Sequence, residues 1–281
     1  MKDQAQILRE MMERRRLGSD SRDGAAGSQP VTIGVTSGNG GAGKTTVALN
    51  LALALQQNHR VCLWDVSGTA ALEILCDCSL LWNLSHVFEG AKRLSEVLVE
   101  GPHGLKLLAG PGLSMLRNSS GGASARISSI LESLSTHCDL LILDLPVAID
   151  RDLECLLEAC DASLLIATPD PTSVTAAYST LKSMRQTNWS LLVNQAESSE
   201  EAVRVIERFQ ETTRLFLQQP IEAAGFVPVD GEIPKATRVR KPLMLSGPNS
   251  MGARAIARLA ERVEAKTMSS QSGTRSMIKS A

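Results

Sequence analysis

The chain has 281 residues, of which 43% are hydrophobic and 21% charged, and its formal net charge is -1. This apolar content excludes an intrinsically disordered chain, and the near-neutral charge argues against a protein that coats nucleic acid. No segment approaches the roughly 18 apolar residues that span a bilayer, and the N-terminus lacks a secretory signal. We therefore expect a cytoplasmic globular protein with no specific nucleic-acid partner.

The N-terminus is expected to form a short amphipathic helix over residues 1–17. Leu8 and Met12 lie four positions apart, and charged residues separate them. Residues 18–30 are small, polar and glycine-rich, which is typical of a flexible linker. Such a tethered helix could fold back onto the domain or dock on a partner, and the sequence leaves both possibilities open.

A compact domain is expected over residues 31–265, followed by a serine-rich, loose tail over 266–281. Short apolar runs predict strands at 31–37, 60–66, 104–110, 139–146, 162–169, 189–195 and 225–230. The intervening patterns predict helices at 44–57, 124–137, 150–160, 172–187, 198–218 and 250–265. This alternation predicts an α/β fold with a mostly parallel sheet covered by helices on both faces.

A phosphate-binding loop is predicted at residues 38–45, because GNGGAGKT matches G-x-x-x-x-G-K-[ST] between an expected strand and an expected helix. Glycines let backbone N–H groups turn toward phosphate oxygens, and the helix adds its positive end. Lys44 is expected to reach the β- and γ-phosphates of ATP, and the Thr45 hydroxyl to bind Mg²⁺. The nucleotide-binding residues expected here are Gly38, Asn39, Gly40, Gly41, Ala42, Gly43, Lys44, Thr45 and Thr46.

Two aspartates complete the expected metal site. Asp65 ends the second expected strand and Asp144 ends the fourth. The carboxyl ends of parallel strands meet at the ligand crevice, and Mg²⁺ prefers oxygen ligands. Thr45, Asp65 and Asp144 are therefore the expected metal ligands, although either carboxylate could instead cap a turn.

With these residues the chain resembles the MinD/ParA family of P-loop ATPases, and most of all its branch of flagellar-number regulators (FlhG, also called FleN or YlxH). The resemblance covers nearly the whole chain. TPDPTSVTAAY at 168–178 is similar to a loop of that branch, and 225–250 follow its pattern of a turn, a basic helix and a second turn. The first residues match the branch's DQAxxLR element at Asp3, Gln4, Ala5, Leu8 and Arg9.

The resemblance implies a regulator of flagellar number or placement that binds ATP, forms an ATP-dependent homodimer and contacts the inner face of the cell membrane peripherally. In the branch, the DQAxxLR helix engages and stimulates the signal-recognition-type GTPase FlhF, so the five residues above are the expected partner-binding residues.

The resemblance also implies that Asn194 reads the adenine base, and that Pro228 and Asp230 line the base and ribose. The amide of Asn194 could instead belong to a turn at the strand end. The family's C-terminal helix contacts membranes, and Ile256 and Leu259 have the matching spacing, but that face could also pack on the domain.

Two positions depart from the family, and with Lys44 they are the expected catalytic positions. Asn39 replaces a lysine that reaches the other subunit's nucleotide, so a charge-assisted contact becomes at best an ordinary hydrogen bond. Ser67 replaces an aspartate that orients the attacking water, and losing a positioned base costs about 10²–10⁴-fold in rate. Hydrolysis is therefore expected to be slow or lost, whereas nucleotide binding survives.

Other functions stay open at this stage. The chain could be a partition-type ATPase that positions another cargo, or a nucleotide-binding adaptor without hydrolysis. The near-neutral charge argues mildly against partition, which uses non-specific DNA binding. A basic cluster of Lys235, Arg238, Arg240 and Lys241 could contact DNA, lipid or a partner, or form a solvated helix face.

Overall fold

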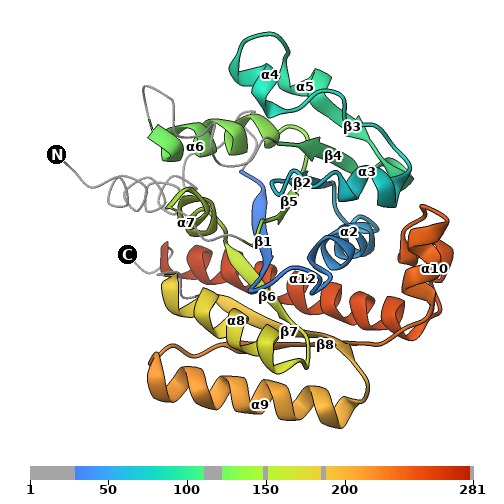
Figure 1. Cartoon of the computed structure of the whole chain (residues 1–281). Helices are drawn as coiled ribbons and strands as arrows, with labels where there is room; N and C mark the ends of the chain where they lie inside the picture. Colours follow the sequence, from blue (N-terminus) through green and yellow to red (C-terminus); the bar gives the residue numbers. More distant parts are fainter. Residues whose placement is uncertain (1–28, 111–121, 148–150, 185–187, 279–281) are drawn as a thin grey trace.

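The computed structural model describes residues 29–110, 122–147, 151–184 and 188–278 (Figure 1). The expected N-terminal helix, the linker up to residue 28 and the expected partner-binding residues Asp3, Gln4, Ala5, Leu8 and Arg9 lie outside these ranges. Within them, the chain folds into an eight-stranded sheet between two layers of helices, which confirms the predicted fold class.

The strands follow the spatial order β3-β4-β2-β5-β1-β6-β7-β8, and every neighbouring pair is parallel except β3 with β4. Their bounds are β1 (Val31–Ser37), β2 (Val61–Asp65), β3 (Leu98–Glu100), β4 (Lys106–Ala109), β5 (Leu140–Asp144), β6 (Ala162–Ala167), β7 (Trp189–Ala196) and β8 (Glu222–Pro228). The seven expected strands are present, β1 at the expected bounds and the other six at shifted bounds. Strand β3 was not expected, because three residues are too few to show a periodic pattern.

The six expected helices are also present, together with several short ones. The helices are α2 (Lys44–Leu55), α3 (Ala71–Cys76), α4 (Leu84–Phe88), α5 (Leu94–Val97), η2 (Pro102–Gly104), α6 (Gly122–Leu134), α7 (Arg151–Glu158), α8 (Pro171–Ser183), α9 (Ser199–Phe216), α10 (Glu232–Arg238), α11 (Leu243–Ser246) and α12 (Met251–Ile278). Sequence patterns missed α3, α4 and α5, because helices of four to six residues complete less than two turns.

The two faces of the sheet carry separate apolar clusters. Leu141 and Leu143 of β5 pack with residues of α6, α7, α8 and α9, whereas Leu140 and Ile142 pack with residues of α2 and α12. Successive side chains of a strand point to opposite faces, so both sets are buried. This explains why the strand sequences are apolar almost throughout instead of alternating.

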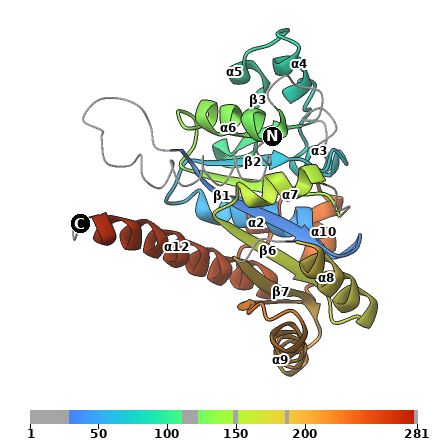
Figure 2. The ribbon, with the colours of Figure 1, turned by 90° about the vertical axis from the view of Figure 1, so that its left-hand side faces the viewer.

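Helix α12 corrects two expectations about the C-terminus. It continues to Ile278 as one long helix (Figure 2), beyond the expected end at residue 265 and into the tail expected to be loose. No proline interrupts this segment, and Lys266 is anchored to Glu222 at 2.8 Å. Ile256 and Leu259 are buried in the cluster shared with α2, so that face packs on the domain and is not free for lipid.

The described helices include none that is long and apolar enough to cross a membrane.

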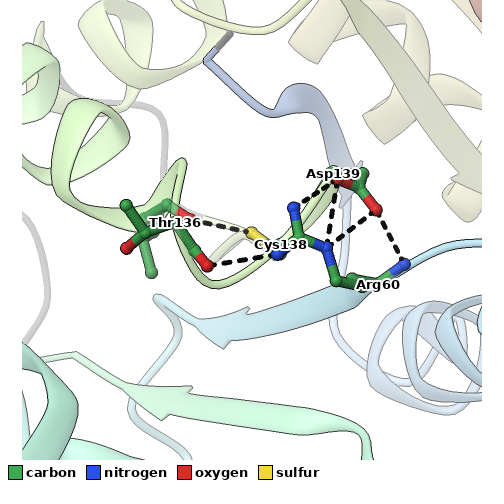
Figure 3. Close-up of polar contacts among 5 residues, drawn as sticks. Arg60, Thr136, Cys138 and Asp139 are labelled. Carbon is green, nitrogen blue, oxygen red and sulfur yellow. Dashed lines mark hydrogen bonds and ion pairs between the residues drawn. The ribbon is translucent and has the colours of Figure 1, made fainter. Parts of the chain in front are cut away.

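The register between β2 and β5 is supported by contacts at their starts. Arg60 Nη2 donates to Asp139 Oδ1 at 2.6 Å, and the Asp139 N–H donates to the Arg60 carbonyl at 2.7 Å (Figure 3). The side-chain hydrogen bonds from Arg60 hold the pKa of Asp139 below its ordinary value. This register aligns Asp65 with Asp144 at the other end of the two strands.

We expect the interior of α2 to carry much of the domain's stability. Leu51 has no exposed surface and belongs to the apolar cluster that α2 shares with α12. Leu51→Ala should therefore lower the free energy of unfolding by about 2–5 kcal/mol, measured by chemical denaturation. Leu81→Ala is the matched control, because Leu81 is 76% exposed. Similar losses in both variants would contradict this packing.

Candidate functional site

The loop between β1 and α2 forms a cradle of backbone groups. Gly41 and Gly43 adopt the left-handed conformation, with φ of 81° and 86°, which a side chain would disfavour. Helix α2 then starts at Lys44, and no side chain caps its first turn, which also contains Thr45 and Thr46. The free N–H groups and the positive end of this helix favour an anion at the loop.

Neighbouring elements press closely on this loop. A Cβ at Gly38 would lie 2.0 Å from the backbone carbon of Ala176 in α8. A Cβ at Gly43 would lie 2.3 Å from Nδ2 of Asn194. These two positions therefore require glycine for close packing, whereas Gly40 faces open space.

The centre of the site is a hydrogen bond between the loop and the end of β5. The Thr45 hydroxyl donates to Asp144 Oδ2 at 2.6 Å. Asp144 has no exposed surface, and its Oδ1 has no hydrogen-bond partner in the structure. Asp65 at the end of β2 is aligned with Asp144 across the paired strands. The three oxygen-bearing residues predicted as metal ligands are thus neighbours.

The two charged side chains Asp144 and Lys44 are buried, which disfavours their charged forms. Burial raises the pKa of Asp144 to about 6, and the Thr45 hydrogen bond opposes this rise, while the charge of Asp65 adds to it. Burial likewise lowers the pKa of Lys44, although the charge of Asp144 opposes that shift. A cation beside Asp144 and an anion beside Lys44 would each favour the charged form of its neighbour.

The residues present fit Mg²⁺. The unpartnered Asp144 Oδ1, the Thr45 hydroxyl and the Asp65 carboxylate offer the oxygen ligands that this hard cation prefers. Across the described ranges, no group of three or more His, Cys, Asp or Glu side chains could hold a metal alone. Further ligands would have to come from water and from phosphate, as is usual for Mg²⁺ beside a nucleotide.

Ser67 lies beside the metal ligands but is engaged with one of them. Its hydroxyl donates to Asp65 Oδ1 at 2.6 Å and lies 3.1 Å from the Thr69 hydroxyl. The Gly68 N–H donates to the same Asp65 oxygen at 3.0 Å. Ser67 therefore helps to shape the turn after β2, and a neutral hydroxyl there is not a general base.

Asn39 is turned inward onto α8. Its side-chain Oδ1 accepts a hydrogen bond from the buried Ser173 hydroxyl at 3.0 Å, and its carbonyl accepts from Ser37 at 2.6 Å. Ser173 Oγ also accepts the Thr168 N–H at 3.0 Å. The sequence did not single out Ser173, although it lies in the TPDPTS segment that carries part of the resemblance.

The end of β7 braces the loop from the other side. Asn194, 5% exposed, donates through Nδ2 to the Ala42 carbonyl at 2.8 Å, and its Oδ1 has no partner in the structure. Gln195 Nε2 donates to the Gly41 carbonyl at 3.2 Å. No sequence pattern points to Gln195, because its contact depends on a left-handed conformation with φ of 60°. An oxygen left free on Asn194 is suited to accept from an amino group such as that of adenine.

Pro228 and Asp230 follow on the neighbouring strand. Pro228 is paired with Ala196 at the end of β7, so it lies next to the strand end that carries Asn194. Asp230 accepts the N–H groups of Glu232 at 2.9 Å and Gly252 at 2.7 Å, which ties the starts of α10 and α12 together. Its role toward a ribose stays a prediction.

Two members of the basic cluster are paired with acidic residues. Lys235 pairs with Glu232 at 2.7 Å, and Arg240 pairs with Asp77 of the segment after α3 at 3.2 Å. Helices α10 and α3 come together only in the folded chain, so the pairing with Asp77 was not visible in the sequence.

Comparison with known proteins agrees with this geometry. Residues 33–243 match the family model described as CobQ/CobB/MinD/ParA nucleotide binding domain. Antiactivator FleN of Pseudomonas aeruginosa is 30% identical over 83% of this chain and 85% of its own length. The flagellum site-determining protein YlxH of Helicobacter pylori is 26% identical over 81% of this chain and 80% of its own.

A solved structure shows the same fold. The septum site-determining protein MinD of Pyrococcus horikoshii, complexed with Mg-ADP, superposes with a TM-score of 0.66 at 21% identity, over 83% of this chain and 95% of its own. The glycine-rich loop, the lysine and threonine that open α2, and the aspartate at the end of β5 thus stand in a matching fold. The chain belongs to the CobQ/CobB/MinD/ParA family of nucleotide-binding proteins.

Proposed function

We propose that this protein binds ATP and ADP with Mg²⁺ at residues 38–45, and that it regulates flagellar number or placement. The main support for nucleotide binding is the hydrogen bond from Thr45 to the buried Asp144, beside the uncapped start of α2. The flagellar role is supported by the similarity to proteins named Antiactivator FleN and flagellum site-determining protein YlxH.

Each residue then has a physical task in binding. The backbone N–H groups of the loop and the start of α2 bind phosphate oxygens, and Lys44 neutralises their charge. Thr45 and Asp144 hold Mg²⁺, which when bound supplies positive charge to the phosphates. Asn194 and Gln195 keep the loop in its binding shape through hydrogen bonds to its carbonyls.

Removing the lysine charge tests this site. Lys44→Ala should weaken binding of Mg-ATP by at least about tenfold, because a hydrogen bond to a charged group contributes about 1.5–3 kcal/mol. Isothermal titration calorimetry with purified protein measures the change. Lys106→Ala removes the same charge from an exposed pair with Glu100, and it should leave affinity unchanged. Equal affinity in wild type and Lys44→Ala would refute the site.

The two departures from the family bear on hydrolysis. The Asn39 side chain is engaged with Ser173, and the Ser67 hydroxyl is engaged with Asp65, so both are occupied within this chain. Neither residue can supply the charge that the family has at its position. These contacts support slow hydrolysis and weak ATP-dependent dimerisation, and they favour a second candidate function, a nucleotide-binding adaptor with little turnover.

Restoring both charged groups should increase turnover and assembly together. We expect Asn39→Lys combined with Ser67→Asp to raise steady-state ATP turnover by about 10²-fold, the lower part of the range for a positioned base. Light scattering with ATP should show more dimer in the same variant, since the restored lysine would act across two subunits. Brisk turnover that rises with concentration in the unmodified protein would contradict the adaptor function.

The proposed partner is an FlhF-type GTPase that docks on residues 1–17. The glycine-rich composition of residues 18–30 separates this segment from the domain that begins at Val31, which supports a fold that does not depend on the N-terminus. A chain that starts at Pro30 should therefore melt like the full chain and yet lose stimulation of the partner's GTP hydrolysis.

The full-length variant Leu8→Glu provides a control for that truncation. It should also abolish stimulation, because a charge replaces an apolar contact, while nucleotide affinity stays unchanged. A large fall in melting temperature of the shortened chain would show instead that the N-terminal helix packs on the domain.

A further inference from the structure

Helix α8 is joined to the phosphate-binding loop by one buried hydroxyl. Ser173 lies in the first turn of α8 and has no exposed surface. Its hydroxyl donates to Asn39 Oδ1 at 3.0 Å and accepts the Thr168 N–H at 3.0 Å. The hydroxyl is therefore used both as a donor and as an acceptor, and it connects the loop, the start of α8 and the segment that follows β6.

Asn39 is held through its side chain and through its backbone. Besides the bond from Ser173, the Asn39 carbonyl accepts the Ser37 hydroxyl at 2.6 Å. The neighbouring Gly38 lies so close to α8 that a Cβ there would be 2.0 Å from the backbone carbon of Ala176. Ala176 comes three residues after Ser173, so one side of α8 supplies both the polar contact and the close packing.

The two halves of the loop are held by different elements of the fold. Asn194 and Gln195 of β7 donate to carbonyls of the second half. Ser173, through Asn39, holds the first half. Gly40 lies between them, faces open space and has no side chain that could anchor it. The backbone N–H groups of the loop are thus fixed from both of its ends.

We propose that Ser173 is a positioning residue for the nucleotide site, which fixes the first half of the loop in its phosphate-binding shape through Asn39. This inference rests on the proposed binding of ATP and ADP at residues 38–45, and it adds to that site a residue from another helix. A loop that already has its binding shape loses less conformational freedom when a nucleotide binds. Nucleotide affinity should therefore depend on the Ser173 hydroxyl.

Removing the hydroxyl tests this role. In Ser173→Ala, Asn39 Oδ1 loses its donor and the Thr168 N–H loses its acceptor. We expect the backbone amides of residues 38–45 to exchange at least about threefold faster in the nucleotide-free full-length variant, measured by hydrogen–deuterium exchange with mass spectrometry. Calorimetry should show that the affinity for Mg-ATP falls by about threefold to tenfold.

A second buried hydroxyl of the same helix provides the matched control. Thr180 is 3% exposed, and its hydroxyl donates to the Ala176 carbonyl at 3.0 Å, within α8. Thr180→Val removes that hydroxyl and keeps the shape of the side chain. It should leave loop exchange and nucleotide affinity unchanged, even if it lowers the melting temperature. A residue that only stabilises α8 would behave like Thr180.

Breaking the same hydrogen bond from the loop gives an independent variant. Asn39→Ala leaves the interior of α8 unchanged and should also speed loop exchange, so the test holds even if Ser173→Ala does not fold. In the Asn39→Ala background, Ser173→Ala should change Mg-ATP affinity by less than about twofold, because the contact is already absent.

Three results would overturn the proposal. They are unchanged loop exchange in Ser173→Ala and Asn39→Ala, equal effects of Ser173→Ala and Thr180→Val, or a loss of affinity from Ser173→Ala that is as large in the Asn39→Ala background as in the wild type. Loop exchange is measured without nucleotide. A wild-type protein that does not bind Mg-ATP would therefore refute the proposed function, while the exchange data still decide whether Ser173 positions the loop.

Discussion

The hydrogen bond between Thr45 and Asp144 joins positions 99 residues apart in the chain, and the site depends on it. It forms because β1 and β5 are neighbours in the middle of the sheet, so the loop after one strand meets the last residue of the other. The same neighbourhood buries Asp144 and raises its pKa to about 6, chiefly by burial. Burial disfavours the charged forms of Asp144 and Lys44. An ion of opposite sign bound beside either group would therefore stabilise its charged form.

The loop itself is held from outside. Asn194 and Gln195 bind its carbonyls on one side, while α8 packs against Gly38 on the other. Contacts within the chain thus hold the cradle in shape, and such support reduces the ordering cost of binding. Asn39 takes part in this support through Ser173. Asn39 thus connects the loop to helix α8 of the same chain.

The outer edge of the sheet is partly covered by side chains of α12. Arg262 and Lys266 close the lower part of β8 and protect an edge that would otherwise be open to pairing.

The sequence by itself determined the fold class, because apolar strands alternating with helices leave few arrangements besides a covered parallel sheet. It also determined the loop at 38–45 and the pair Asp65 and Asp144, since their spacing places them at strand ends. The loop and the two strand ends are defined by residues close together in the sequence. They can therefore be recognised without knowing how distant segments pack.

Only the tertiary structure decided which strands are neighbours, and therefore that Thr45 meets Asp144 while Ser67 meets Asp65. It also decided the roles of Ser173 and Gln195, the pairing of Arg240 with Asp77, and the burial of the apolar face of α12. Each depends on contacts between distant segments or on a left-handed backbone, and neither leaves a periodic pattern in the sequence.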